Sequence, residues 1–322
     1  MKNLRETVLR LGQARVLVVG DAMLDRYVFG RVDRVSPEAP VPVLAVEREL
    51  SEPGGAGNVV HNLCAIGASV AFVSVVGDDQ AGAELTGLIG GQKEVEPWLL
   101  VQGGRTTTLK TRFVASGSRR GGQQLLRTDR EDRRPIHPKL AERLMRIARE
   151  AMAATSIVVL SDYRKGVLGG GMAPLLIAAA KAAGRRVIAD LRAADWAIYA
   201  GADVIVPHAR DVLGEEDEAS LLPAAAQALR AAHGFGAVLV KCGDGGFLLA
   251  DAEGELLMPL VPGDPVDLSG AGDSAVAVFA AALASGADLR RAARLATVAA
   301  GVIGAVPGSA VVTPAALTEA LQ

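Results

Sequence analysis

The chain has 322 residues, a formal net charge of −2 and a pI near 6.1, and half of its residues are hydrophobic although only 3% are aromatic. This length can bury a large core, either as one large α/β domain or as two small ones, and that core must be built from Ala, Val and Leu. The near-neutral charge argues against nucleic acid or a membrane surface as the main partner, so any phosphate binding must be local.

Three features bear on the cellular setting. Cys64 and Cys242 lie far apart with no C-x-x-C spacing, which favours neither a disulfide framework nor a zinc site and predicts a reduced, cytoplasmic location. The N-terminal stretch carries charges within its apolar pattern, unlike a signal peptide. The uncharged stretch 295–317 is interrupted by Gly and Pro, so we expect a buried helix and a loop there instead of a membrane span.

The first predicted strand is Arg15–Gly20 (RVLVVG), an apolar and β-branched run. No G-x-G-x-x-G follows it, which argues against a dinucleotide-binding dehydrogenase. Asp21 comes directly after this strand, at the sheet edge where α/β folds bind ligands. It could accept hydrogen bonds from sugar hydroxyls, or it could cap a turn.

An extended segment without helical period follows at Tyr27–Arg48, where prolines confine pairing to edges and turns. A glycine turn then leads into a helix-like run. Gly54, Gly55 and Asn58 in this turn could offer N–H groups and an amide to a polyhydroxylated ligand, or the turn could be a flexible loop with Asn58 as an ordinary first helical residue.

A second strong strand is predicted at Ser69–Gly77, followed by a helix that opens at Asp78-Asp79. Short alternating runs return at about 98–129. Together with 27–48 they predict a small β lid separate from the main sheet.

Lys110 and Arg112 lie two apart in this alternating region, on one face of a strand predicted at Thr106–Val114. They could neutralise a substrate phosphate under the lid, or they could be charges on an exposed strand face. Both signs of charge mix in Arg127–Arg134, which we interpret as a solvated surface leading to a helix near Pro138.

Strands and helices alternate from Ile157 onwards. This pattern predicts a largely parallel sheet with helices on both faces, and acidic or glycine residues recur where the strands end. The predicted strands are 157–162, 185–190, 202–207 and one ending at 241–243, and the predicted helices are 171–183, 211–233, 270–285, 288–304 and 313–321. The turn Gly243-Asp244-Gly245-Gly246 suits nucleotide phosphates and equally suits a hairpin into the next strand.

The stretch Asp267–Ser274 (DLSGAGDS) combines a glycine turn with the start of a long apolar helix. The turn Gly270-Ala271-Gly272 would present unpaired N–H groups that can hold a phosphoryl group in transfer. A carboxylate at Asp273 would repel that anion unless it takes a proton from the attacking hydroxyl. The alternative is that Asp273 only complements the helix dipole.

The run D-x-x-G-A-G-D-[ST], together with Gly54-Gly55-x-Gly57-Asn58, resembles the signatures of the ribokinase/PfkB family of sugar kinases. The resemblance covers nearly the whole chain and implies a single ribokinase-like domain, 1–322, with a three-layer α/β/α architecture and a small β lid. Within the family, Arg34–Val43 and Ser161–Gly166 resemble the heptose-7-phosphate kinases of lipopolysaccharide core synthesis. Some of those kinases are fused to a nucleotidyltransferase, and this chain resembles the stand-alone form.

The resemblance implies transfer of the γ-phosphoryl group of ATP, with Mg²⁺, to the anomeric hydroxyl of a heptose 7-phosphate, giving a 1,7-bisphosphate. It also assigns roles to the candidate residues. The catalytic set is Asp273 as base with the backbone of Gly270, Ala271 and Gly272; the substrate set is Asp21, Gly54, Gly55, Asn58, Lys110, Arg112, Asp162 and Lys165; the nucleotide set is His208, Asp211, Lys241, Gly243, Asp244 and Gly246.

One stretch departs from the family. The family has N-x-x-E after the strand at 203–207, where this chain has His208-Ala-Arg-Asp211. Asp keeps the charge with a shorter reach, and His changes the donor pattern. If Asp211 helps to hold Mg²⁺, we expect it to act through water.

Two other functions stay open. One is a kinase of another sugar or of a nucleoside, such as fructose 1-phosphate or ribose. The other is a non-catalytic sugar or nucleotide sensor on this fold, which the intact glycine motifs disfavour. Because the lid exposes β edges, we also expect a homodimer formed through it.

Overall fold

The structure is a computed structural model that describes residues 2–116, 122–192, 195–214, 219–261, 267–306 and 310–322. The helices are α1 (Lys2–Val8), α2 (Ala56–Ala65), α3 (Gln80–Gly90), α4 (Pro138–Ala154), α5 (Met172–Ala182), α6 (Ala209–Leu213), α7 (Leu222–His233), α8 (Ala271–Ala284), α9 (Leu289–Gly304) and α10 (Pro314–Ala320). The strands are β1 (Arg15–Gly20), β2 (Ala22–Val35), β3 (Pro42–Gly55), β4 (Ser69–Gly77), β5 (Val95–Gln102), β6 (Thr108–Ala115), β7 (Gln123–Arg130), β8 (Ile157–Asp162), β9 (Arg186–Leu191), β10 (Val204–Val206), β11 (Ala237–Lys241), β12 (Phe247–Asp251) and β13 (Gly254–Met258).

A nine-stranded sheet forms the centre of the protein, in the order β13-β12-β11-β10-β9-β8-β1-β4-β5. From β11 to β5 all neighbours pair in parallel, and β12 and β13 add an antiparallel edge. Parallel neighbours need long crossovers, which the helices provide. The expected mostly parallel sheet is confirmed.

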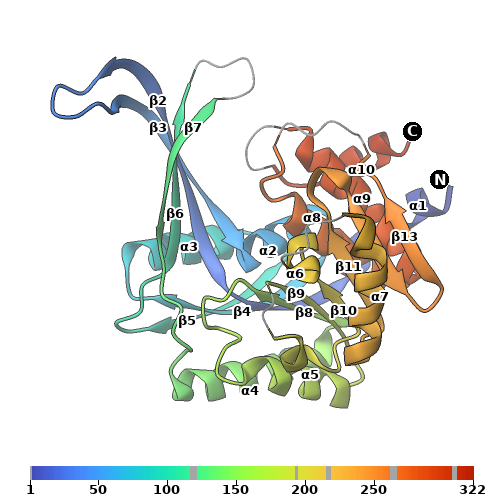
Figure 1. Ribbon diagram of the computed structural model, residues 1–322. Helices are drawn as coiled ribbons and strands as arrows, with labels where there is room; N and C mark the ends of the chain where they lie inside the picture. Colours follow the sequence, from blue (N-terminus) through green and yellow to red (C-terminus); the bar gives the residue numbers. More distant parts are fainter. Residues whose placement is uncertain (1, 117–121, 193–194, 215–218, 262–266, 307–309) are drawn as a thin grey trace.

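Helices cover both faces of this sheet (Figure 1). Successive side chains of a strand point to opposite faces. On β1, Val16 and Val18 therefore join the core under α2, α8 and α9, whereas Leu17 and Val19 join the core under α4 and α5. The result is the three-layer α/β/α architecture that the strand and helix alternation predicts.

A second, four-stranded sheet projects from this body, in the order β3-β2-β6-β7 (Figure 1). It corresponds to the expected β lid, but its boundaries differ from the prediction. Residues 98–102 belong to β5, which pairs in parallel with β4 at the edge of the main sheet. The alternation of this run is that of an edge strand with one face exposed, so the pattern alone could not assign it to either sheet.

The predicted helices are found with small shifts of their ends. Asp79 caps α3 by accepting the N–H of Gly82 at 2.9 Å, which agrees with a helix opening at that residue. The helix expected over 211–233 is instead α6 and α7, and residues 215–218 between them lie outside the described part of the chain.

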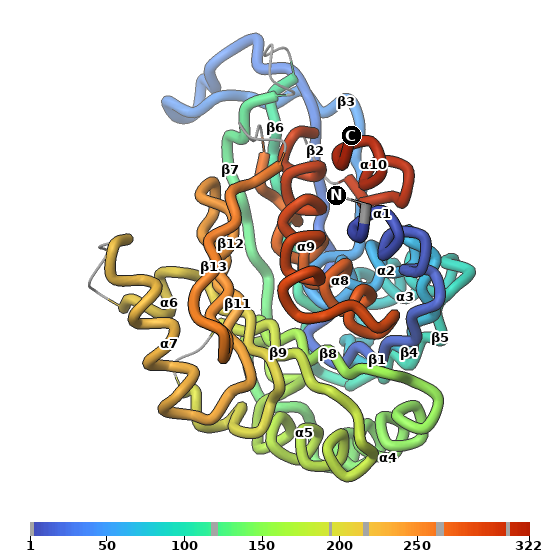
Figure 2. The backbone as a smooth tube through the Cα atoms, turned by 90° about the vertical axis from the view of Figure 1, so that its right-hand side faces the viewer, coloured from blue at the N-terminus to red at the C-terminus, as the bar shows by residue number. Residues whose placement is uncertain are grey.

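The uncharged stretch 295–317 begins within α9 and ends within α10. None of the helices formed by the described residues combines the length and apolar character that a bilayer crossing requires. The two ends of the chain meet, because α1 and α10 lie side by side (Figure 2) and the Arg5 side chain donates to the carbonyl of Leu321 at 3.1 Å.

Candidate active site

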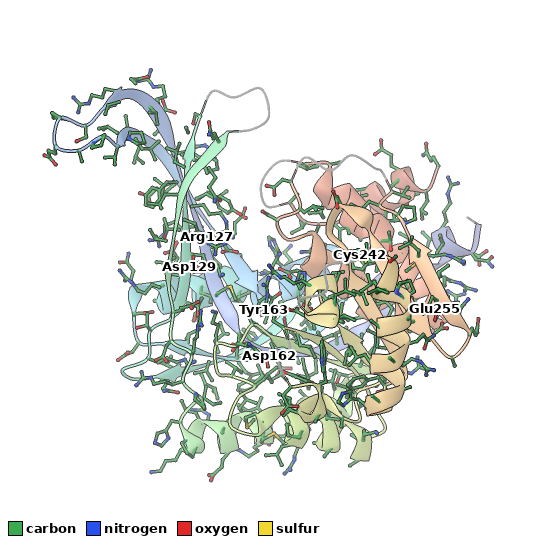
Figure 3. All side chains as sticks on the ribbon, in the orientation of Figure 1. Arg127, Asp129, Asp162, Tyr163, Cys242 and Glu255 are labelled. Atoms are coloured by element: carbon green, nitrogen blue, oxygen red, sulfur yellow. The ribbon has the colours of Figure 1, made fainter. Side chains whose placement is uncertain are left out.

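A cavity of about 540 Å³ lies between the small sheet and the carboxyl ends of the main strands. Ligands bind at this edge in open α/β sheets. All four strands of the small sheet, β3, β2, β6 and β7, contribute to the lining. The main body contributes α2, the segments that follow β8, β9 and β10, the end of β11 and the start of α8. Figure 3 shows Tyr163 near the centre of the molecule, with Arg127 and Asp129 on the small sheet.

Asp273 faces this cavity from the first turn of α8. Two donors from other parts of the chain hold its carboxylate. The Tyr163 hydroxyl donates to Oδ1 at 2.6 Å, and Nδ2 of Asn58 donates to Oδ2 at 2.8 Å. The predicted residues Asn58 and Asp273, 215 positions apart, are thus in direct contact.

The surroundings also tune the acidity of this carboxyl. Its removal from water raises the pKa of Asp273 to about 6, and the negative charge of Asp190 adds to the rise. The hydrogen bonds from Tyr163 and Asn58 and the charge of Lys241 oppose it. A carboxyl with a pKa near 6 is ionised at neutral pH yet more basic than an ordinary aspartate, which suits a general base.

The N–H groups available at the start of α8 differ in part from the predicted set of Gly270, Ala271 and Gly272. Gly270 has φ +76°, and a Cβ there would lie 2.9 Å from the Asn58 amide nitrogen, so only glycine fits without displacing Asn58. The N–H of Ala271 is already used within the turn, donating to the carbonyl of Leu268 at 3.2 Å. No acceptor among the described residues takes the N–H of Gly272 or Asp273, which leaves these two groups for an anion.

Behind Asn58 lies a buried polar network that connects α2 to α8. Asn62, fully buried, donates to the Asn58 side-chain oxygen at 3.1 Å. Its own oxygen accepts from the Ser274 hydroxyl at 2.9 Å and from the N–H of Val312 at 3.0 Å. Because each member is satisfied by another, the network fixes Asn58 against Asp273.

The three cations expected to bind a substrate phosphate all line the cavity, and each is already paired with a carboxylate. Lys110 lies 3.6 Å from Asp129, and Arg112 lies 2.8 Å from Asp25. Lys165 forms an ion pair with Glu131. More basic than acidic side chains nevertheless line the cavity: the basic ones are Lys110, Arg112, Arg127, Arg133, Arg164, Lys165, Arg192 and Lys241, and the acidic ones are Asp25, Asp129, Glu131 and Asp273.

Asp21 does not reach this cavity, contrary to the prediction that it binds sugar hydroxyls. It is 1% exposed, and its carboxylate accepts the N–H groups of Tyr163, Lys165 and Val167 at 2.9, 2.9 and 3.0 Å. Asp21 therefore orders the loop after β8. This role resembles the alternative prediction, in which Asp21 caps a turn. Asp25, four positions later and within β2, lines the cavity instead.

The glycine turn before α2 lies against this same part of β2. A Cβ on Gly54 would lie 2.4 Å from Asp25 Oδ2, so glycine here lets the chain pass close to that carboxylate. Gly55 is the N-cap residue of α2 and lines the cavity, whereas Gly54 does not.

Two further carboxylates point elsewhere. Asp162, predicted to contact substrate, accepts the N–H of Arg164 at 2.7 Å and the hydroxyl of Tyr199. It does not line the cavity. Asp211 also lies outside the lining, and its Oδ2 is buried with no hydrogen-bond partner among the described residues.

On the side of β9 to β11, Lys241 and His208 line the cavity. Lys241 forms an ion pair with Asp190, and the two side chains are only 8% and 4% exposed. Removal of the imidazole from water and the charge of Lys241 lower the pKa of His208 to about 3, so this residue is neutral at physiological pH. The turn with Gly243, Asp244 and Gly246 joins β11 to the antiparallel β12, as the hairpin alternative predicts, and does not line the cavity.

The structure thus brings Gly55, Asn58, Lys110, Arg112, Lys165, His208, Lys241, Gly270, Gly272 and Asp273 together around one cavity. It places Asp21, Gly54, Asp162, Asp211, Gly243, Asp244, Gly246 and Ala271 outside the lining.

Several site residues were not predicted. The run 127–134, interpreted as solvated surface, contributes Arg127, Asp129, Glu131 and Arg133 to the cavity, although Arg127 and Arg133 remain exposed. Their spacing of two was a usable signal, because alternate residues of a strand share one face. Tyr163 had no comparable signal, since its partner lies 110 positions away.

The fold and this site define a sugar kinase: a ribokinase-type α/β/α sandwich with a β lid over a basic cavity. Residues 13–316 match the pfkB family of carbohydrate kinases, and the chain belongs to that family. It is 53% identical over 317 residues to a bifunctional protein HldE of Acidiphilium cryptum and 43% identical over 309 residues to one of Caulobacter vibrioides. These alignments cover 97% and 94% of this chain but 64% and 62% of the relatives, so the chain spans just under two thirds of their length.

Solved structures share the fold at low sequence identity. An Arabidopsis thaliana ribokinase complexed with ribose and ATP superposes with a TM-score of 0.73 at 20% identity, covering 96% of this chain and 99% of that one. Phosphofructokinase-2 from Escherichia coli, in complex with substrates and products, gives 0.76 at 19% identity, covering 95% and 97%.

Proposed function

We propose that this kinase transfers the γ-phosphoryl group of ATP to the anomeric hydroxyl of D-glycero-D-manno-heptose 7-phosphate, giving the 1,7-bisphosphate for ADP-heptose and lipopolysaccharide core synthesis. The observation that carries the proposal is Asp273, a carboxylate at the open start of α8 that faces a predominantly basic cavity. The similarity to HldE proteins and the resemblance of Arg34–Val43 and Ser161–Gly166 to heptose-7-phosphate kinases support this sugar.

In the proposed reaction Asp273 takes the proton of the anomeric hydroxyl. The sugar oxygen then forms a bond to the γ-phosphorus while the bond from that phosphorus to the β,γ-bridging oxygen breaks, and ADP leaves with this oxygen. The free N–H groups of Gly272 and Asp273 would stabilise the charge on the transferring group, and the cations of the cavity would orient both phosphorylated ends.

Magnesium would enter with the triphosphate. Mg²⁺ usually keeps several waters and binds one or two carboxylates together with substrate phosphates. Asp211 lies outside the cavity lining, but its Oδ2 lacks a partner among the described residues, so it would hold the ion only through bound water. The ion would neutralise part of the triphosphate charge.

Release of ADP over a panel of sugars tests the proposal directly. We expect release with heptose 7-phosphate and ATP, and little with ribose, fructose 1-phosphate or nucleosides. If one of those compounds is phosphorylated instead, the protein is a kinase but its proposed sugar substrate is wrong. A protein that binds the sugar but releases no ADP with any member of the panel would be a sensor on this fold.

Lys110→Met tests whether Lys110 binds the 7-phosphate of the sugar. A hydrogen bond to a charged group contributes about 1.5–3 kcal/mol, so we expect KM for heptose 7-phosphate to rise roughly tenfold or more while KM for ATP stays the same. Lys139→Met is the matched control, because Lys139 is exposed on α4 and does not line the cavity. Equal KM values for the two variants would remove Lys110 from the phosphate site.

We also propose that the protein is a homodimer formed through the small sheet. This sheet and the connection between β2 and β3 expose Val32, Val35, Val41, Val46, Leu50, Leu125 and Leu126. Clustered exposed apolar side chains on a sheet with open edges favour a contact with a second copy.

Sedimentation analysis checks this assembly. The unaltered protein is expected to sediment as a dimer, and Leu126→Glu as a monomer, because a charge cannot be buried unpaired in an apolar contact. Leu257→Glu is the control: Leu257 is 67% exposed on β13, at the far edge of the main sheet, and this variant should stay dimeric. A monomeric unaltered protein would refute the proposal.

A further inference from the structure

Tyr163 has a place in the site that the proposed reaction does not yet use. Its hydroxyl donates to Asp273 Oδ1 at 2.6 Å, while Asn58 donates to Oδ2 at 2.8 Å. Each oxygen of a carboxylate can accept about two hydrogen bonds. Two donors, one on each oxygen, therefore fix the plane of the Asp273 carboxylate and still leave acceptor capacity for a sugar hydroxyl.

Hydrogen bonds to a buried side chain hold the loop that carries Tyr163. The Asp21 carboxylate accepts its backbone N–H together with those of Lys165 and Val167. The neighbouring Arg164 has φ +57° and is the only non-glycine residue with positive φ in the described part of the chain. A residue in this region persists only when its surroundings impose the conformation. Asp162 accepts the N–H of Arg164 at 2.7 Å, and Asp21 accepts the N–H groups of the residues on either side of it, so these two carboxylates together support the loop that carries the Tyr163 ring.

Tyr163 acts only as a donor in this contact. Removal of its ring from water and the charge of Asp273 both raise its pKa well above the usual value, so the phenol keeps its proton. A neutral O–H that donates to a carboxylate stabilises the ionised form, which is the form that a general base requires.

We propose that Tyr163 is a positioning residue for the general base, holding Asp273 by Oδ1 in the orientation in which it meets the attacking hydroxyl. This inference rests on the proposed function of Asp273. It assigns a role to the Ser161–Gly166 stretch beyond the side chain of Lys165: the stretch presents a phenol to the catalytic carboxylate.

The groups that face Asp273 set the expected pH dependence. Tyr163 and Asn58 donate to it, Lys241 is a nearby positive charge and Asp190 a nearby negative one. Loss of the phenol O–H removes a contribution that lowers the pKa of Asp273, so that pKa rises. As the pH falls, Asp273 is then protonated at a higher pH than in the unaltered enzyme, and the activity that depends on its ionised form is lost at that higher pH.

The test compares Tyr163→Phe with the unaltered enzyme, on whichever sugar of the panel the unaltered enzyme phosphorylates. We expect kcat on the alkaline plateau to fall about 10- to 100-fold, KM for the sugar to stay within about threefold, and the acid limb of kcat to move up by about one pH unit. Tyr199→Phe is the matched control, since Tyr199 donates to Asp162 and does not touch Asp273. Its acid limb should not move.

The outcomes separate this inference from the proposed function. An inactive Asp273→Asn with an unmoved acid limb in Tyr163→Phe would overturn the role of Tyr163 alone. An active Asp273→Asn would overturn the base and Tyr163 together. If Tyr163→Phe only lowers the unfolding temperature and leaves kcat and its pH profile as they were, Tyr163 has a structural role and the inference is wrong.

Discussion

Asp273→Asn is expected to lower kcat by about 100- to 10,000-fold, the range that a positioned general base contributes. The amide cannot take the proton of the attacking hydroxyl, but it keeps the volume of the carboxyl and an oxygen that can accept from Tyr163. ATP binding should therefore survive. ADP release measures the first effect and titration calorimetry with ATP the second. Near-normal turnover would show that Asp273 is not the base.

A stability measurement would check that the Asp273→Asn variant is folded. The Asp273 carboxyl titrates near 3.8 in an unfolded chain and at about 6 in the folded protein. The folded state therefore gains stability from the protonated carboxyl below pH 4, and this gain is lost as the pH rises through 6. Asn carries no such charge. Partial solvent exposure and the altered contact with Asn58 both reduce the size of this effect. We therefore expect the free energy of unfolding of Asp273→Asn at pH 8 to be about 1–2 kcal/mol higher than that of the unaltered protein. The difference should vanish near pH 4.

Much of the main sheet could be predicted because its strands are buried on both faces. The runs Arg15–Gly20 and Ser69–Gly77 are almost entirely apolar and are buried after their first residue, and such a pattern indicates parallel strands without any knowledge of their neighbours. Residues 98–102 were misassigned because β5 is an edge strand, and an edge strand of the main sheet alternates like a strand of the lid. Its pairing with β4 depends on contacts that local periodicity does not contain.

Part of the candidate site could be proposed from the sequence, at positions where the backbone conformation restricts the residue type. A glycine turn before an apolar helix indicates an anion site. A carboxylate beside such a site would repel the anion, so its presence there indicates a chemical role such as that of a general base. Asp21 and Asp25 could not be told apart in this way, since both follow β1 within five residues. The structure separates them: Asp21 is consumed by three backbone N–H groups, whereas Asp25 faces the cavity and pairs with Arg112.

Contacts between distant segments were beyond the reach of the sequence. The Tyr163 hydroxyl meets Asp273 across 110 positions, and Lys241 meets Asp190 across 51. Each of these side chains has an ordinary local setting, and only the order of the strands brings them together. The cations expected to bind phosphate show the same limit, because their carboxylate partners come from other strands or loops.

Lys241→Met should have the largest effect on stability of the variants considered. Lys241 and Asp190 are 8% and 4% exposed, and Asp190 Oδ2 has no hydrogen-bond partner among the described residues. Removal of the lysine would leave a buried carboxylate without its counter-charge, which costs about 3–5 kcal/mol. Thermal unfolding should show a loss of several degrees at pH 7.

The double variant Lys241→Met, Asp190→Leu separates the two roles of Lys241. Replacement of a buried ion pair by apolar side chains of similar size is often nearly neutral, so most of the lost unfolding temperature should return. Lys241 also lines the cavity and opposes the rise in the pKa of Asp273, whereas Asp190 promotes that rise. If Lys241 binds the nucleotide, KM for ATP must stay high in the double variant even though its stability has recovered. A KM for ATP that recovers together with the stability would limit Lys241 to balancing the charge of Asp190.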